Sequence, residues 1–120
     1  MNILVVEDNA LNLRLVRDIL EMRGHTVEAA GDVDEARSRL RGPRPALVLM
    51  DIHIPGGGGE LVLREIRADP ALAGLPVVAV TAQAMEGDRQ RLLAAGFDGY
   101  LSKPIDVRTF AATVESFVRP

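Results

Sequence analysis

The stretch ALVLMDIHIPGGGGEL, residues Ala46–Leu61, contains in succession an apolar run, a single carboxylate and a glycine-rich loop. Residues 46–50 form a short apolar run, which is typical of a strand buried in a sheet. Asp51 follows at once, and four consecutive glycines then lead into a segment of helical period. Loops of this kind before a helix hold phosphates in many proteins, yet a bare carboxylate repels a phosphate. The stretch therefore allows two interpretations: a loop that binds a phosphate, or an aspartate that receives one.

The same alternation of apolar runs and helical segments continues along the whole chain. The predicted strands are Asn2–Val6, His25–Ala30, Ala46–Met50, Pro76–Val80 and Gly99–Leu101. The predicted helices are Leu11–Met22, Val33–Leu40, Glu60–Ala68, Glu86–Ala95 and Val107–Val118. Five strand–helix units in a row predict an α/β fold, a doubly wound (βα)5 domain whose five-stranded parallel sheet has helices on both faces. Such a fold needs right-handed crossovers.

The composition indicates one globular domain, residues 1–120. The chain has 120 residues, 48% of them hydrophobic, and no cysteine, so we expect a core without disulfides or thiolate metal sites. The net charge of −3 and the scattered basic residues favour neither nucleic acid nor a membrane as the main partner. The local cluster Arg37, Arg39, Arg41 and Arg44 is interpreted as a solvated helix end. No run approaches the roughly 20 apolar residues of a membrane span, and no signal peptide is evident, so we expect a cytoplasmic protein.

Polar side chains stand where the predicted strands end. Glu7 and Asp8 follow the first strand, Asp51 the third and Thr81 the fourth, and Lys103 comes two residues after the fifth. In open parallel sheets the carboxyl ends of the strands meet at one edge, where ligands bind. We therefore expect these five side chains to converge at one site.

The expected site suits phosphoryl transfer. Three carboxylates in one crevice repel each other unless a cation joins them, and hard oxygen ligands without histidine or cysteine neighbours favour Mg²⁺. Aspartate is a known nucleophile toward phosphoryl groups, and it forms an acyl phosphate. The Lys103 ammonium and the Thr81 hydroxyl would neutralise charge on the transferred group.

An ordered set of motifs strengthens this interpretation. These are Val5-Val6-Glu7-Asp8-Asn9, Leu49-Met50-Asp51 with Pro55 and Gly59, Val80-Thr81-Ala82, and Tyr100-Leu101-Ser102-Lys103-Pro104. The chain resembles a response-regulator receiver domain along nearly its whole length. With Asn12 and residues 84–88, its signature is similar to those of single-domain cell-division regulators of α-proteobacteria and of receivers in hybrid histidine kinases. The resemblance implies a flavodoxin-like sheet with strand order 2-1-3-4-5.

The resemblance also implies a metal site and a phosphate acceptor. Asp51 would accept the phosphoryl group from a phosphohistidine. Asp8 and Asp51 would coordinate Mg²⁺ directly, with Mn²⁺ as a substitute, and Glu7 would act through a water molecule. The backbone carbonyl of His53 would be a further ligand, which leaves the imidazole of this residue free.

Further roles implied by the resemblance concern the signal. Lys103 and Thr81 would contact the phosphoryl group, and Thr81 and Tyr100 would switch position after phosphorylation. Pro104 is a candidate for a cis peptide bond. The output would be a changed binding surface on the fourth helix, fifth strand and fifth helix. The expected partners are a histidine kinase or histidine phosphotransfer protein and a downstream protein, with the chain a monomer or a phosphorylation-dependent dimer.

The sequence leaves two alternatives open. The chain could be a receiver from a longer hybrid kinase or multidomain regulator. A second class is a small Mg²⁺-dependent phosphatase of doubly wound fold, which would need a second acid just after the nucleophile, where this chain has His53. We expect a signalling protein that promotes its own phosphorylation and dephosphorylation, and no turnover enzyme.

Overall fold

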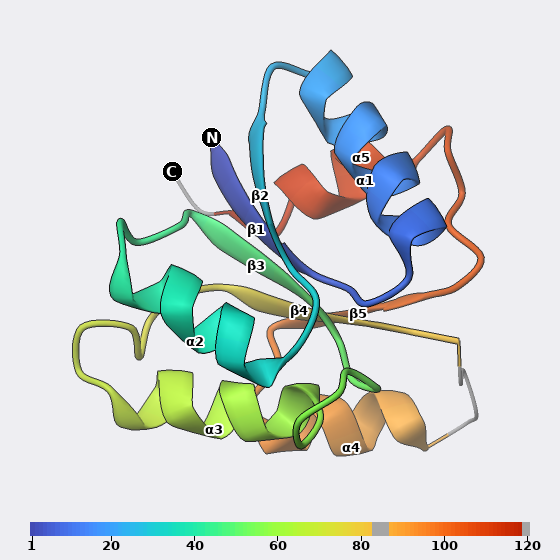
Figure 1. Ribbon diagram of the computed structural model, residues 1–120. Helices are drawn as coiled ribbons and strands as arrows, with labels where there is room; N and C mark the ends of the chain where they lie inside the picture. Colours follow the sequence, from blue (N-terminus) through green and yellow to red (C-terminus); the bar gives the residue numbers. More distant parts are fainter. Residues whose placement is uncertain (83–86, 119–120) are drawn as a thin grey trace.

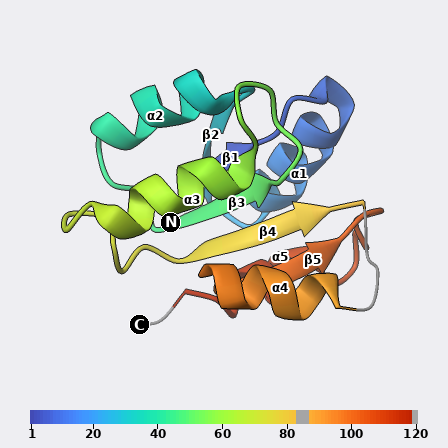
Figure 2. The same cartoon turned by 90° about the horizontal axis from the view of Figure 1, so that it is seen from below.

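Five parallel strands form one sheet in the order β2-β1-β3-β4-β5, and helices cover both of its faces (Figures 1 and 2). The structure is a computed structural model that describes residues 1–82 and 87–118. The strands are β1 (Asn2–Val6), β2 (Thr26–Ala30), β3 (Leu47–Asp51), β4 (Val77–Thr81) and β5 (Gly99–Ser102). The helices are α1 (Ala10–Met22), α2 (Val33–Arg41), α3 (Gly59–Ala68), α4 (Asp88–Ala95) and α5 (Phe110–Glu115). The predicted fold class and strand order are confirmed.

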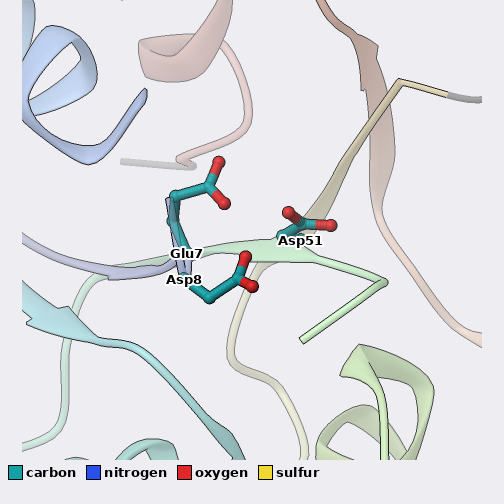
Figure 3. Close-up of side chains that lie close together, drawn as sticks. All are labelled: Glu7, Asp8 and Asp51. Atoms are coloured by element: carbon teal, nitrogen blue, oxygen red, sulfur yellow. The ribbon is translucent and has the colours of Figure 1, made fainter. Parts of the chain in front are cut away.

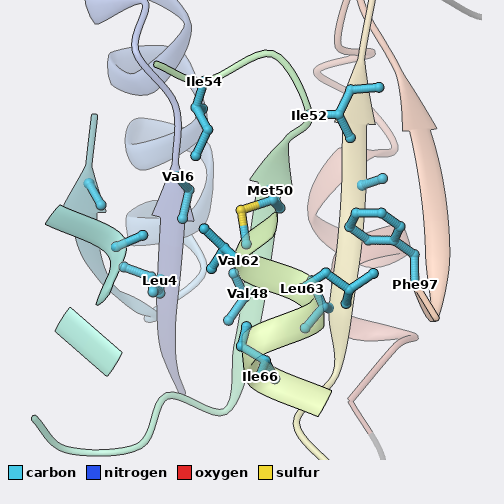
Figure 4. Close-up of a cluster of buried hydrophobic side chains, with 14 of the residues drawn as sticks. Leu4, Val6, Val48, Met50, Ile52, Ile54, Val62, Leu63, Ile66 and Phe97 are labelled. Carbon is cyan, nitrogen blue, oxygen red and sulfur yellow. The ribbon is translucent and has the colours of Figure 1, made fainter. Parts of the chain in front are cut away.

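The sheet separates two apolar cores because successive side chains of a strand point to opposite faces. In β1, Leu4 and Val6 pack with residues of α2, α3 and α4, whereas Ile3 and Val5 pack with residues of α1 and α5. Figure 4 shows the first of these cores, where the α3 side chains lie against β1 and β3. Both faces of the central strands are therefore buried, which explains why β3 and β4 read as continuous apolar runs.

The last helix is shorter than predicted. It begins at Phe110 and not at Val107, because Asp106 makes a turn in which its carboxylate accepts the Arg108 N–H at 3.0 Å. The chain after Glu115 continues in tighter turns, with the N–H of residue 118 bonded to the Glu115 carbonyl three residues before it. Residue 86, the predicted start of the fourth helix, lies outside the described residues. Among the helices described here, none is both long and apolar enough to cross a membrane.

Arg67 joins the end of α3 to the two connections beside it. Its guanidinium donates to the carbonyls of Gly96, Ala73 and Leu75 at 2.8, 2.9 and 2.6 Å, and to the Asp98 carboxylate at 2.8 Å. Asp98 in turn accepts the N–H of Val77, the first residue of β4. One side chain, about a quarter exposed, therefore satisfies carbonyls from two loops.

Replacing Arg67 by alanine is expected to lower the free energy of unfolding by about 2 to 4 kcal/mol, because several carbonyls lose a charged donor at once. Urea unfolding followed by circular dichroism measures this change. Arg64→Ala, an exposed arginine on the same helix, is the control and is expected to change stability by less than about 0.5 kcal/mol. Equal effects of the two substitutions would contradict the role of Arg67.

Glu115 ties the end of α5 to the turn between α1 and β2. Arg23 donates to both of its carboxylate oxygens, and the His25 Nε2 lies 2.6 Å from Oε2. The Arg23 hydrogen bonds, followed by that of His25, lower the pKa of Glu115 to about 2. The contact is solvent-exposed at Arg23, so salt screens it.

This pKa shift predicts an acid-dependent contribution to stability. Because the pKa of Glu115 is lower in the folded chain than in the unfolded chain, its carboxylate stabilises the fold fully at pH values above the unfolded pKa of a glutamate, about 4.3. This contribution is lost as the pH falls through the folded-state pKa of about 2. The urea midpoint of the native chain should therefore exceed that of Glu115→Gln at about pH 5. The difference should shrink steadily as the pH falls from about 5 to about 2. A constant difference across this range would contradict the assignment.

Candidate functional site

Three carboxylates meet at the carboxyl ends of β1 and β3. Val6 is level with Met50 in the sheet, so Glu7 and Asp8 emerge beside Asp51. Figure 3 shows the three side chains turned toward one another, and one oxygen from each lies within 4.8 Å of the others. Glu7 and Asp51 are buried, whereas Asp8 is exposed. The edge of the sheet therefore carries the predicted acidic cluster, with one member open to solvent.

Lys103 lies between two of these acids. Its Nζ donates to Glu7 Oε1 at 2.7 Å and to Asp51 Oδ2 at 3.0 Å. The Lys103 N–H donates to the Thr81 carbonyl at 2.8 Å, which extends the β4–β5 pairing and places the lysine at this edge. The Lys103–Pro104 peptide bond is cis. Lys103 is also the only lysine of the chain, so the remaining basic side chains are arginines and the two histidines.

The environment moves the pKa values of the two buried acids in opposite directions. Burial raises the pKa of Glu7, and the nearby Asp51 adds to this, while Lys103 opposes it. Burial alone would raise the pKa of Asp51 too, but the His53 N–H, Glu7 and Lys103 together lower it. The pKa of Lys103 is raised because its two acidic partners outweigh burial. Asp51 is thus held as a carboxylate, the form that a nucleophile needs.

Asp51 is also positioned by the backbone that follows it. Its Oδ1 accepts the His53 N–H at 2.9 Å, and the Gly59 N–H donates to the Ile52 carbonyl at 3.0 Å. A Cβ at Gly59 would lie 2.7 Å from both the Asp51 carbonyl oxygen and the Met50 Cγ, closer than such atoms approach. The start of α3 can therefore pack against Asp51 only because residue 59 is glycine.

The glycine run forms a tight turn beside the acceptor. Gly56, Gly57 and Gly58 have φ values of 97°, 133° and 85°, in the region that side chains disfavour. The Pro55 carbonyl accepts the N–H of Val33, the first residue of α2, at 3.0 Å. The loop thus reverses the chain and contacts α2. The N–H groups of Gly58 and Gly59 donate to the Ile54 and Ile52 carbonyls at 3.2 and 3.0 Å, so these two amides are already engaged and do not form a phosphate cradle.

The two switch candidates occupy neighbouring strands. Thr81 ends β4 and is fully buried, one residue beyond Val80, which is level with Asp51. Tyr100 lies in β5 and is half-buried against the core that α2, α3 and α4 cover. The sheet therefore places Thr81 near the acceptor and Tyr100 on the face beneath α4. His53 is exposed, as a residue with a free imidazole would be.

Asn9 has a structural role that was not predicted from the sequence. Its side chain accepts the N–H groups of Leu11 and Asn12 at 3.0 and 3.1 Å and so caps α1. Its own N–H lies 3.3 Å from Glu7 Oε2. An asparagine directly after an acid pair and before a helix was the available signal, since asparagine is a preferred N-cap. The cap connects the start of α1 to the acidic cluster.

The donor set fits a hard divalent cation. The acidic cluster offers carboxylate oxygens that converge within a few ångströms, and one of its acids is open to solvent. Mg²⁺ prefers one or two carboxylates and retains several waters, and such an arrangement needs an open side.

Comparisons with known proteins agree with the fold. The family model of the response regulator receiver domain matches residues 3–115. The chain therefore belongs to the response regulator receiver domains of two-component signalling. Members of this family are signalling proteins that bind Mg²⁺ or Mn²⁺ in an acidic pocket and interact with histidine kinases and downstream effectors.

Individual relatives refine this placement. The polar-differentiation response regulator DivK of Brucella anthropi is 40% identical over 117 residues, which cover 98% of this chain and 95% of that protein. A receiver domain of a Pseudomonas aeruginosa sensor histidine kinase, solved with magnesium in its active site cleft, is 33% identical with a TM-score of 0.87, over 97% of this chain and 95% of that one. The Mn²⁺-bound response regulator Rcp1 is 30% identical with a TM-score of 0.81, over 96% and 89%.

Proposed function

We propose that this chain is a two-component response regulator that accepts a phosphoryl group from a phosphohistidine onto Asp51. The observation that carries this proposal is the hydrogen bonding of Lys103 to both Asp51 and Glu7, beside Asp8, at 2.7 to 3.0 Å. In the transfer, an Asp51 oxygen bonds to phosphorus while the phosphorus–nitrogen bond breaks. The electron pair of that bond remains on the imidazole nitrogen of the donor.

The acidic cluster would hold the metal ion. Asp8 and Asp51 would bind Mg²⁺ directly together with the His53 carbonyl, Glu7 would act through a water, and Mn²⁺ would substitute because it accepts the same oxygen ligands. When bound, the ion supplies positive charge beside the phosphoryl oxygens. The magnesium-bound and manganese-bound relatives support this assignment by analogy.

Lys103 and Thr81 would stabilise the transferred group. Lys103 already points at Asp51, so a phosphoryl oxygen on that residue could accept the hydrogen bond that Asp51 accepts now. The Thr81 hydroxyl would hydrogen-bond a second phosphoryl oxygen. As Thr81 moves toward the phosphate, Tyr100 would follow and change the surface formed by α4, β5 and α5, which would alter binding of a downstream protein.

The α1 surface suits the docking of a phosphodonor. Leu11 and Leu15 are 79% and 38% exposed on the helix that begins beside the acidic cluster. Leu13, on the same helix, is half-buried against the core formed with residues of α1 and α5. A helical pair of a histidine kinase or phosphotransfer protein would cover the exposed leucines.

The remaining parts of the proposal concern the chain as a whole. Residues 1–120 would act as a single receiver domain, as a monomer or a phosphorylation-dependent dimer, and would not turn over an external substrate. A receiver that works within a longer hybrid kinase or multidomain regulator would share the same chemistry. A phosphatase is less favoured, because the residue two positions after Asp51 is the exposed His53 and not an acid.

Incubation with acetyl phosphate and Mg²⁺, followed by intact mass spectrometry, tests the proposed function. We expect a gain of one phosphoryl group that requires the metal and is absent when EDTA is added. The lability of the product to hydroxylamine identifies an acyl phosphate. No gain with a fresh donor that phosphorylates a known receiver in parallel would overturn the proposal.

A further inference from the structure

A groove of about 570 Å³ lies between the carboxyl-terminal halves of α2 and α3. We call it the α2–α3 groove; its lining consists of Arg37, Leu40, Arg41, Gly42, Arg44, Val62, Glu65, Ile66, Asp69, Ala71 and Leu72. Figures 1 and 2 show α2 and α3 side by side on one face of the sheet, with the loops that follow them at the end opposite the carboxyl end of β3. Asp51 is the last residue of β3. A ligand in this groove would therefore leave the phosphorylation site uncovered.

The groove contains positive charge that the fold leaves unpaired. Arg37 donates to both oxygens of Glu65 at 2.8 and 2.6 Å, so these two charges neutralise each other. Arg41 and Arg44 are exposed, and no ion pair engages either of them among residues 1–82 and 87–118. The remaining acid, Asp69, already accepts the Ala71 N–H at 2.9 Å. Apart from the Arg37–Glu65 pair, the lining thus has two positive charges, on Arg41 and Arg44, and one negative charge, on Asp69. The groove therefore has a net positive charge.

The floor of the groove is aliphatic. Val62 and Ile66 are buried there, and Leu40 and Leu72 are half-buried against the same core. The residues that line the groove include no aromatic side chain, so a nucleotide base would find no ring on which to stack. Its volume lies in the range of about 300 to 1,000 Å³ that is typical of ligand sites.

We propose that the α2–α3 groove binds an acidic peptide segment of a partner protein, with aliphatic side chains on the floor and carboxylates on Arg41 and Arg44. Guanidinium groups match carboxylates through paired hydrogen bonds, and the aliphatic floor suits leucine or isoleucine side chains. The proposal is independent of phosphoryl transfer, because the groove lies near the amino-terminal ends of β3 and β4, whereas Asp51 lies at the carboxyl end of β3. The variant Asp51→Asn is accordingly expected to bind the segment as the native chain does.

Amide NMR spectra of the ¹⁵N-labelled chain test this site with a designed probe. The probe is an acetylated, amidated hexapeptide of alternating glutamate and leucine, and its glutamine–leucine analogue is the uncharged comparison. We expect saturable shifts at Leu40, Ile66 and Leu72 with the glutamate peptide, and affinity at least about tenfold weaker in the variant Arg41→Glu with Arg44→Glu. The variant Arg14→Glu with Arg89→Glu carries the same charge change on exposed positions of α1 and α4 and should bind normally.

Several results would overturn the proposal. These are the absence of saturable shifts at millimolar peptide, shifts confined to another surface, equal binding of the glutamine peptide, and equal weakening by both double variants. Adenosine monophosphate forms a separate arm, and saturation of the same amides by the nucleotide but not by the glutamate peptide would reassign the groove to nucleotides. The amide spectrum of each variant shows directly whether it is folded.

Discussion

Replacing Asp51 by asparagine is expected to abolish the gain of a phosphoryl group from acetyl phosphate. Asparagine keeps an oxygen that can accept the His53 N–H, which is 2.9 Å from Asp51 Oδ1, so the loop should hold its shape. An amide oxygen is a far weaker nucleophile than a carboxylate and cannot form the acyl phosphate. The rate of labelling, measured by intact mass over time, should fall by at least about a thousandfold, the size of effect expected when a nucleophile is removed.

Asp8→Asn is the matched control for this substitution. It also removes one acidic charge from the cluster, but it leaves the nucleophile in place. We expect labelling that is slower and needs more Mg²⁺, with the phosphoryl group still on Asp51 after peptide mapping. Full labelling of Asp51→Asn at the native rate would place the acceptor elsewhere and contradict the proposed function.

Replacing Lys103 by alanine is expected to slow phosphorylation by about a hundredfold to a thousandfold. This is the usual loss when one donor aimed at developing negative charge is removed. Lys103 donates to Asp51 and Glu7 at 3.0 and 2.7 Å, so its removal also leaves two buried carboxylates facing each other. Their mutual repulsion is relieved when a divalent cation binds between them.

A second measurement separates this effect from a loss of metal. The acids that would bind Mg²⁺ remain in Lys103→Ala, and a competing cation is gone, so calorimetry should show Mg²⁺ affinity that is undiminished. Lys103→Arg keeps the charge but changes the geometry of the donors, and we expect a smaller defect than with alanine. Native labelling rates in Lys103→Ala would show that this lysine does not contact the transferred group.

Much of the fold was predictable because the sequence pattern is local. The apolar runs of β1, β3 and β4 are buried on both faces, and their limits lie within one residue of the prediction. The last helix was predicted to begin at Val107 but begins at Phe110, because the Asp106 carboxylate accepts the Arg108 N–H and forms a turn before the helix. Arg67, which binds carbonyls up to 29 residues away, had no local signal at all.

The candidate site was predictable in its members but not in its internal pairing. Strand ends meet at one edge in any parallel sheet, so the positions of Glu7, Asp8 and Asp51 followed from the strand pattern. The sequence suggested that Lys103 would face a phosphoryl group, and the structure shows its ammonium donating to two acids, Glu7 and Asp51. Residues separated by 96 positions, such as Glu7 and Lys103, can be paired only when the sheet is assembled.

The stretch from Ala46 to Leu61 shows which features follow from local sequence and which follow from tertiary packing. By itself, the sequence determined that a buried strand ends in a carboxylate and that a glycine turn leads into a helix, because these depend on neighbouring residues. Only the tertiary structure decided that Gly59 must lack a side chain, since the atoms in its way are the Asp51 carbonyl and the Met50 side chain. The tertiary structure likewise created the α2–α3 groove, because Arg41 and Leu72 lie far apart in sequence and become neighbours only when both helices pack on the sheet.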